Sequence, residues 1–189
     1  MSPQFVDFDA DGILDIVAGI FDGSPHLVRG SAKGWLTPET MLDRDGNRIA
    51  LNQFWNFEAK KWDRTLAHDT KATLAEREKL QKERAEREQK PVHEDLHDFG
   101  HLTSAIAFDL DGDRDFDLLL GDHQSGHIYY RINEGTAKAS KFSTINEVLL
   151  ADGKPIDVPG TVATMRLVDW NRDNLMDLAV GSMGDAYQD

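Results

Sequence analysis

Short apolar runs bounded by turn residues recur along the chain in a fixed order. The run 105–108 is followed by a strongly acidic stretch, and then by a second run, 118–121, that ends in glycine. Runs of four to six apolar or β-branched residues bounded by turn residues are typical of buried strands. The same order recurs around residues 5–19 and 165–181, so the sequence predicts an internal repeat of strand, acidic loop and strand.

Each repeat continues beyond its second apolar run. Residues 26–29 match residues 127–130, and residues 42–49 match residues 149–156 around a shared Asp-Gly pair. An Asp-Gly pair between apolar residues is typical of a two-residue hairpin. The predicted unit is therefore strand, acidic loop, strand, strand, Asp-Gly hairpin and strand. Four short antiparallel strands per repeat are typical of a β-propeller blade.

The predicted fold class is all-β, with propeller-type four-stranded antiparallel blades and one helical insertion. The predicted parts are a first blade at 1–50, a charged helical insertion at 51–98, a second blade at 99–160 and a partial third blade at 161–189. About two and a half blades form an incomplete propeller, because closed propellers usually have four to eight. We therefore expect a fragment of a larger protein, or a protomer that needs further blades or another protomer.

The insertion differs from the repeats in composition. Four aromatic residues come first, namely Phe54, Trp55, Phe57 and Trp62. A charged stretch without glycine or proline then runs from 71 to 90. Three of its five glutamates precede a lysine or arginine by four residues, a spacing that stabilises helices. We expect one solvated helix whose first half packs on the propeller, because the apolar positions do not continue as the heptads of a coiled coil.

Three acidic loops carry Asp or Asn at relative positions 1, 3, 5 and 9. The first acidic loop spans residues 7–15, the second 109–117 and the third 169–177. Carboxylates this close repel one another, so each loop destabilises the fold unless a counter-ion is present. Clustered oxygen ligands suit a hard cation, and calcium accepts six to eight of them. The loops are not EF-hands, because they lack Glu at position 12 and the flanking segments are strands.

The loop pattern, followed by an apolar run and glycine, resembles the FG-GAP and VCBS repeats, which include the calcium-binding blades of integrin α-subunit propellers. This resemblance implies up to three Ca2+ ions, one in the loop between the first two strands of each blade. Carried over by position, the metal ligands are Asp7, Asp9, Asp11, the Ile13 carbonyl and Asp15; Asp109, Asp111, Asp113, the Asp115 carbonyl and Asp117; and Asp169, Asn171, Asp173, the Leu175 carbonyl and Asp177. Arg114 and Asn174 replace the glycine found at position 6 of the first loop, Gly12, which predicts poorer geometry in the second loop.

The resemblance also implies a role and a location. It indicates a non-enzymatic recognition, adhesion or scaffold module with a protein or carbohydrate ligand. Related repeats are extracellular, periplasmic or at the cell surface, although residues 1–5 have neither the basic start nor the apolar stretch of a signal peptide.

Composition narrows the possible partners. The 189 residues carry a formal net charge of −13, and so acidic a surface does not suit nucleic acid, whose binding depends on Lys and Arg contacts to phosphate. No cysteine is present, which excludes disulfides and thiolate metal sites. No apolar run reaches the roughly 18 residues of a spanning helix, so we expect no membrane insertion.

Two enzymatic alternatives stay open from the sequence. His93, Glu94 and His97 fit the His-Glu-x-x-His pattern of zinc hydrolases, in which two histidines bind the metal and the glutamate acts as base. Pro91 and the polar flanks of the motif count against a buried helix there. The second alternative is the propeller portion of an enzyme whose active site lies elsewhere.

One further Asp-rich segment imitates the start of an acidic loop. Asp43, Asp45 and Asn47 repeat the spacing of positions 1, 3 and 5, but position 9 is Leu51. The matching segment of the second repeat lacks two of the three polar residues, since Leu150 and Lys154 replace Asp43 and Asn47. We therefore predict a plain turn rather than a fourth metal loop.

Overall fold

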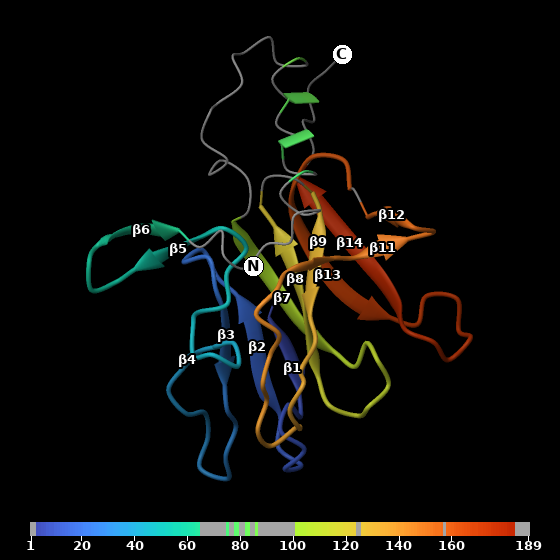
Figure 1. Cartoon of the computed structure of the whole chain (residues 1–189). Coiled ribbons are helices and arrows are strands. Elements are labelled where there is room, and N and C mark those ends of the chain that lie inside the picture. Colours follow the sequence, from blue (N-terminus) through green and yellow to red (C-terminus); the bar gives the residue numbers. More distant parts are fainter. Residues whose placement is uncertain are drawn as a thin grey trace.

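The strands of the protein form small antiparallel sheets, and the all-β prediction is confirmed (Figure 1). This computed structural model describes residues 3–64, 75, 78, 79, 82, 83, 86, 101–123, 126–156 and 158–183. Two sheets have four strands and three have two strands, within those residues. All strand pairs within the sheets are antiparallel.

The two four-stranded sheets are meanders, in which strands adjacent in sequence pair with one another. The first sheet contains β1 (Gln4–Val6), β2 (Asp15–Gly19), β3 (Pro25–Val28) and β4 (Glu39–Thr40). The second contains β7 (Leu102–Phe108), β8 (Asp117–Asp122), β9 (Ile128–Arg131) and β10 (Glu147–Val148). The predicted four-stranded antiparallel repeat is therefore present twice.

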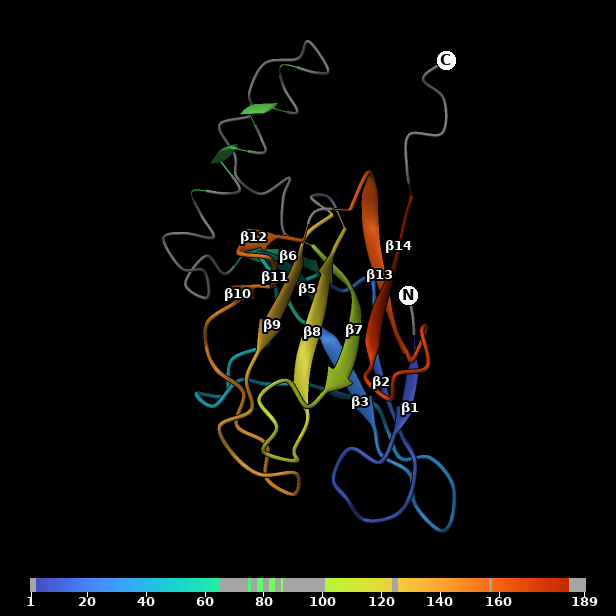
Figure 2. The ribbon, with the colours of Figure 1, turned by 90° about the vertical axis from the view of Figure 1, so that its right-hand side faces the viewer.

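The remaining sheets have two strands each. The third repeat contributes β13 (Thr161–Val168) and β14 (Asp177–Met183). Two hairpins complete the fold: β5 (Gln53–Asn56) with β6 (Lys61–Arg64), and β11 (Leu150–Ala151) with β12 (Lys154–Pro155). The three acidic loops lie at the same end of their sheets, the lower end in both views, and the β5–β6 hairpin lies at the opposite end (Figures 1 and 2).

The second sheet is covered on both faces. Leu118 and Leu120 of β8 pack with Val17 and Leu27 of the first sheet in one buried cluster. Leu119, which points to the other face, packs with Met165 of β13 in a second cluster. Successive side chains of a strand alternate between faces, so this division explains why every residue of β8 is buried.

Equivalent glycines allow neighbouring sheets to approach closely. A Cβ atom on Gly19, the last residue of β2, would lie 2.6 Å from the backbone of Ser104 in β7. A Cβ on Gly121, the equivalent residue of β8, would collide with the carbonyl oxygen of Ala163 in β13. In the first two repeats, the glycine that ends the second apolar run therefore permits the first strand of the next sheet to pack against it.

The predicted order within the repeat needs two corrections. The fourth strands β4 and β10 precede the Asp-Gly turns rather than follow them. Gly19 pairs with Pro25 and Gly121 pairs with Ile128, so His26 corresponds to Tyr129 rather than to His127. The longer β8–β9 connection causes this shift, because it adds residues that the sequence match placed in the strand.

The first part of the predicted helical insertion is a β-hairpin. Residues 51–64 contain β5 and β6, and Leu51 and Asn52 are buried, so residue 51 belongs to the core between the two four-stranded sheets. The Trp55 amide donates a hydrogen bond to the Asp22 carbonyl (2.7 Å), and Trp62 packs edge-on against Phe21. Of the charged stretch 71–90, only residues 75, 78, 79, 82, 83 and 86 are described; their backbone is helical, but they do not define a helix, and the rest lies outside the described residues.

Candidate metal centres

The aspartate at position 9 ties each acidic loop to its sheet. Asp15 accepts hydrogen bonds from the amides of Phe8 (3.0 Å) and Gly30 (2.7 Å). Asp117 accepts equivalent bonds from Leu110 (2.8 Å) and Asn133 (2.7 Å). Both aspartates are buried, so each bond satisfies a carboxylate oxygen that water reaches poorly. Position 9 therefore has a structural role in addition to any role as a ligand.

The aspartate at position 1 turns inward over the loop. Asp7 accepts hydrogen bonds from the amides of Asp11 (2.9 Å) and Gly12 (3.0 Å). Asp109 accepts them from Gly112 (2.8 Å) and Arg114 (3.1 Å), and Asp169 accepts two in the same way. The three loops thus share one fold, in which the loop backbone holds the first carboxylate toward the loop centre.

Two positions of every acidic loop have left-handed backbone. At position 6, φ is 88° for Gly12, 77° for Arg114 and 68° for Asn174, so the left-handed turn expected there is present. At position 4, φ is 55° for Ala10, 83° for Gly112 and 65° for Arg172. The first and second loops therefore each contain one glycine and one residue with a Cβ in this region. Arg114 therefore gives no reason to expect poorer loop geometry in the second loop than in the first.

The first two loops bring three carboxylates together. One oxygen from each of Asp7, Asp9 and Asp15 lies within 4.8 Å of the others, and the same holds for Asp109, Asp111 and Asp117. The carboxylates at positions 1, 3 and 9 thus converge in both loops. The position 5 aspartates Asp11 and Asp113 are not members of these groups; their carboxylates accept hydrogen bonds from the amides two residues later. No third group of three such side chains occurs among the described residues.

The third loop repeats the geometry in a more exposed setting. Asp177 accepts a hydrogen bond from the Trp170 amide (2.8 Å), as Asp15 and Asp117 do at their loops. Asn171 donates a hydrogen bond to Asp173 (2.9 Å), so an attractive amide–carboxylate contact replaces the repulsion of a carboxylate pair. Residues 170–176 are all exposed, because only two strands support this loop in the described part of the third repeat.

Electrostatic strain concentrates in the second loop. Burial raises the pKa of Asp117, and the neighbouring Asp111 and Asp113 raise it further. The hydrogen bonds that Asp117 accepts from two backbone amides lower its pKa and offset part of this rise. Burial also raises the pKa of Asp115, again with repulsion from Asp113 and Asp117. Both shifts mean that the ionised form is disfavoured here, which a bound cation would reverse.

Two carboxylate oxygens at these loops have no hydrogen-bond partner although they are buried. They are Oδ1 of Asp9 and Oδ1 of Asp115, and Asp115 as a whole is only 6% exposed. A buried carboxylate oxygen without a partner is costly, and oxygen atoms of this kind are ligands for hard cations. The donor set of the first two loops therefore fits a divalent oxygen-seeking cation, and the Asp115 side chain adds a carboxylate oxygen to that of its predicted carbonyl ligand.

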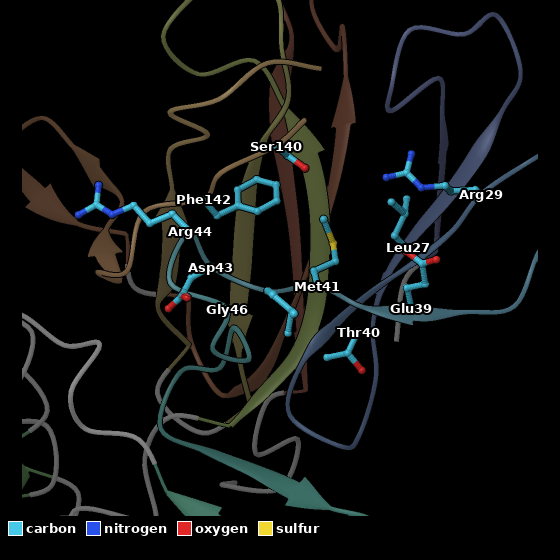
Figure 3. A pocket seen from close by; sticks show the side chains of 11 residues that line it. Leu27, Arg29, Glu39, Thr40, Met41, Asp43, Arg44, Gly46, Ser140 and Phe142 are labelled. Atoms are coloured by element: carbon cyan, nitrogen blue, oxygen red, sulfur yellow. The ribbon is translucent and has the colours of Figure 1, made fainter. Parts of the chain in front are cut away.

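Arg29 is a residue at the first acidic loop that sequence reasoning missed. Its guanidinium forms an ion pair with Oδ2 of Asp9, at position 3 of the first loop. Arg29 follows β3 directly, and β3 pairs with β2, so only the sheet pairing places it beside the loop. It also lines an open pocket of about 340 Å³ between β3, β4 and the segment around Phe142 (Figure 3).

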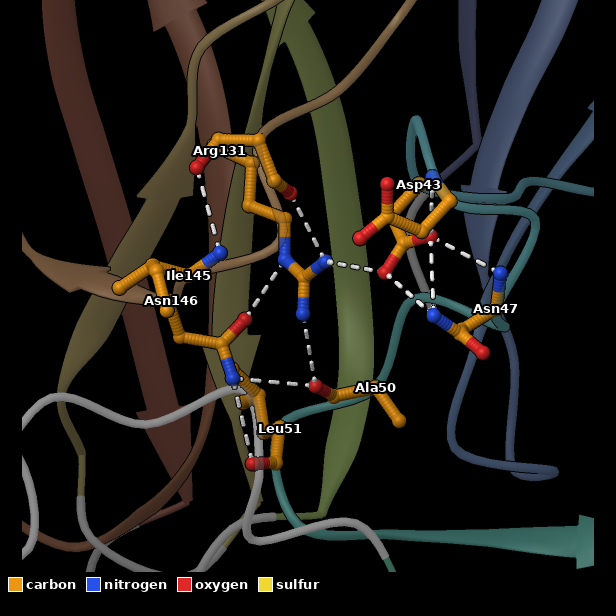
Figure 4. A network of polar contacts seen from close by, with 9 residues as sticks. Asp43, Asn47, Ala50, Leu51, Arg131, Ile145 and Asn146 are labelled. Atoms are coloured by element: carbon orange, nitrogen blue, oxygen red, sulfur yellow. Dashed lines mark hydrogen bonds and ion pairs between the residues drawn. The ribbon is translucent and has the colours of Figure 1, made fainter.

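The Asp43 turn, residues 43–47, is a structural element, as predicted. Asp43 accepts hydrogen bonds from the amides of Asp45 (3.0 Å) and Asn47 (2.8 Å), and its Oδ2 lies 3.9 Å from Nη1 of the fully buried Arg131 (Figure 4). Arg131 in turn donates to Asn146 Oδ1 (2.8 Å) and to the Ser143 carbonyl (3.0 Å). This carboxylate already has a buried cation.

The structure does not test the zinc hydrolase alternative. His93, Glu94 and His97 lie outside the described residues. His101, at the start of β7, is buried in an aromatic group with Phe21, Trp62 and His123. Burial and the neighbouring His123 lower the pKa of His101, which keeps its ring neutral near pH 7.

Comparisons of the chain with protein-family models, with curated proteins and with solved structures found no match. Within the described residues, no helix combines the length and apolar character needed to cross a membrane.

Proposed function

We propose that the protein is a calcium-binding module built from propeller-type blades, with calcium sites in the first and second acidic loops and a weaker one in the third. The observation that carries the proposal is the convergence of carboxylates from positions 1, 3 and 9 in two separate loops, within 4.8 Å in each. Calcium prefers such clusters of carboxylate and carbonyl oxygens. The proposed carbonyl ligands are those of Ile13, Asp115 and Leu175.

The chain's own residues would contribute in two ways. Asp7, Asp109 and their loop amides hold a carboxylate toward the loop centre, and Asp15 and Asp117 fix the loop to strand β2 or β8. The ion would supply positive charge that offsets the repulsion among these carboxylates. Binding would thereby stabilise the sheets to which the loops are tied.

The propeller arrangement and the recognition role belong to the same proposal. Two four-stranded meanders, packed so that the first strand of each later sheet lies against the preceding one, support the blade interpretation. The resemblance to FG-GAP and VCBS repeats supports a non-enzymatic recognition, adhesion or scaffold role outside the cytoplasm. Further blades or another protomer would complete the propeller.

Thermal unfolding with calcium or with a chelator tests the proposal. Ligand at a hundredfold excess over its Kd adds about 2.7 kcal/mol to the free energy of unfolding. For a chain of this size we expect the melting temperature to rise by about 5–10 °C in millimolar calcium. Magnesium should have a smaller effect, because it prefers a rigid octahedral shell that keeps several waters.

Matched variants locate the effect. Asp7→Asn combined with Asp109→Asn should reduce the calcium response strongly, since it removes one candidate ligand from each converging group. Asp45→Asn is the control, because Asp45 is an exposed acid of the Asp43 turn and should leave the response unchanged. Identical melting curves in calcium and chelator would refute the proposal.

A further inference from the structure

The first acidic loop already contains a cation supplied by the protein. Arg29 forms its ion pair with Asp9, and the two side chains are only 32% and 20% exposed. Asp9 is one of the three carboxylates that converge at this loop, and its other oxygen, Oδ1, is buried without a hydrogen-bond partner. One candidate ligand is therefore neutralised before any metal binds.

The second loop has no equivalent of this residue. The amides of Gly30 and Asn133 donate to Asp15 and Asp117 in the same way, so the residue that corresponds to Arg29 is Ile132. Isoleucine cannot neutralise Asp111, and Asp111 has no ion-pair partner within the described part of the chain. The two loops thus offer a natural comparison of one carboxylate group with and without a resident cation.

We propose that Arg29 is a built-in counter-ion that competes with calcium for Asp9, so that the first loop binds calcium more weakly than the second. This inference rests on the proposed function. A divalent ion that binds Asp9 must displace the guanidinium or bear its repulsion at close range. The pocket that Arg29 lines, which also contains Glu39, offers the displaced side chain an alternative position (Figure 3).

The consequence is a division of roles between the loops. The first loop would be held together by Arg29 at low calcium and would take up the ion only at higher concentration. The second loop, whose carboxylates lack such a partner and repel one another, would bind first. This order of calcium affinity is the reverse of the one expected from Arg114 at position 6, which predicts the weaker site in the second loop.

The amides of two glycines allow calcium binding to be measured separately at each of the two loops. The Gly12 amide donates to Asp7 (3.0 Å), and the Gly112 amide donates to Asp109 (2.8 Å), so each reports on the carboxylate at position 1 of its own loop. The experiment is a calcium titration of the full chain followed by the amide NMR signals of these two glycines. It compares the parent protein with Arg29→Ile and with Ile132→Arg, which exchange the two equivalent residues.

We expect calcium to shift Gly112 at lower concentration than Gly12 in the parent. Arg29→Ile should tighten binding at Gly12 about five- to tenfold and leave Gly112 unchanged, a size that corresponds to about 1 kcal/mol for a partly exposed pair. Ile132→Arg should weaken binding at Gly112 and leave Gly12 unchanged. The spread of the remaining amide signals verifies that each variant is folded.

The two possible failures can be told apart. If Gly12 responds equally, or at higher calcium, in Arg29→Ile, the competition is refuted while calcium binding stands. If neither glycine responds to calcium in the parent protein, the proposed function fails and the inference fails with it.

Discussion

The second acidic loop and the Asp43 turn start with the same spacing of polar residues, yet their carboxylates meet opposite surroundings. Asp43 faces inward, where the buried guanidinium of Arg131 and the amide of Asn47 meet it. Carboxylate oxygens of Asp109, Asp111 and Asp117 converge, and burial, followed by repulsion from Asp111 and Asp113, raises the pKa of Asp117.

Two features separate the segments. The acidic loops have left-handed backbone at positions 4 and 6, whereas the Asp43 turn has it only at position 4, where Gly46 has a φ of 81°. The acidic loops also end in an aspartate that accepts a hydrogen bond from the amide at position 2 of the loop and, in the first two loops, another from an amide just after the third strand of the sheet. Leu51 stands at that place after the Asp43 turn. Spacing at positions 1, 3 and 5 therefore does not distinguish an acidic loop from a turn; position 9 and the second left-handed residue do.

The largest expected effect comes from removing the cation of the Asp43 turn. Arg131→Met leaves the buried Asp43 without its counter-charge and Asn146 without its donor. Breaking a buried charge network on one side costs about 3–5 kcal/mol. We expect a large loss of stability in chemical denaturation, together with a retained calcium response, because the acidic loops do not use Arg131.

Arg44→Met is the control for this variant. Arg44 pairs with Glu134 on the surface, where both side chains are more than 40% exposed, so its loss should change stability little. Equal destabilisation by the two variants would contradict the prediction, because the buried network of Arg131 would then contribute no more than an exposed ion pair.

Substitutions in the second loop that separate the structural role of Asp117 from the proposed ligand role of Asp111 should have an intermediate effect on stability. Asp117→Asn weakens the hydrogen bonds that residue 117 accepts from the amides of Leu110 and Asn133. A buried polar group left without a hydrogen-bond partner lowers the free energy of unfolding by about 1–3 kcal/mol. Asp111→Asn alters an exposed member of the same group and should leave the calcium-free protein nearly unchanged. Both should weaken calcium binding at this loop, as measured by calorimetry.

This pair of variants has a clear contrary outcome. If Asp111→Asn leaves calcium binding intact while Asp117→Asn lowers stability alone, the converging carboxylates have a structural role and no metal role.

The repeat, the sheet type and the loop geometry could be predicted because they depend on neighbours in sequence. Strand runs, the aspartate spacing and the left-handed residue at position 6 are all local properties. The hairpin of residues 53–64 could not be predicted in the same way. Trp55 and Trp62 are partners across the two strands of this hairpin. The charge pattern of residues 71–90 is typical of a helix, and it led to the prediction of a helical insertion for the whole segment.

The partners of the acidic residues were beyond reach for a different reason. Arg29 reaches Asp9 only because β3 pairs with β2, and Arg131 reaches Asp43 across 88 residues of sequence. Neither residue stands out in composition or spacing. Contacts between strands or between repeats decide which carboxylates are neutralised, and no local pattern records them.

The smallest expected effect concerns the left-handed positions that distinguish the loops from the turn. Ala10 and Arg114 occupy such positions, and the left-handed conformation costs a residue with a Cβ roughly 1–2 kcal/mol. Substitution by glycine removes this cost, but it also increases the conformational entropy of the unfolded chain, which offsets part of the gain. We expect Ala10→Gly and Arg114→Gly each to raise stability by about 0.5–1 kcal/mol, measured by chemical denaturation in chelator. Gly112→Ala, at a φ of 83°, should lower it by a similar amount. If Ala10→Gly destabilises the protein, the first loop does not hold the left-handed backbone at position 4 that sets it apart from an ordinary turn.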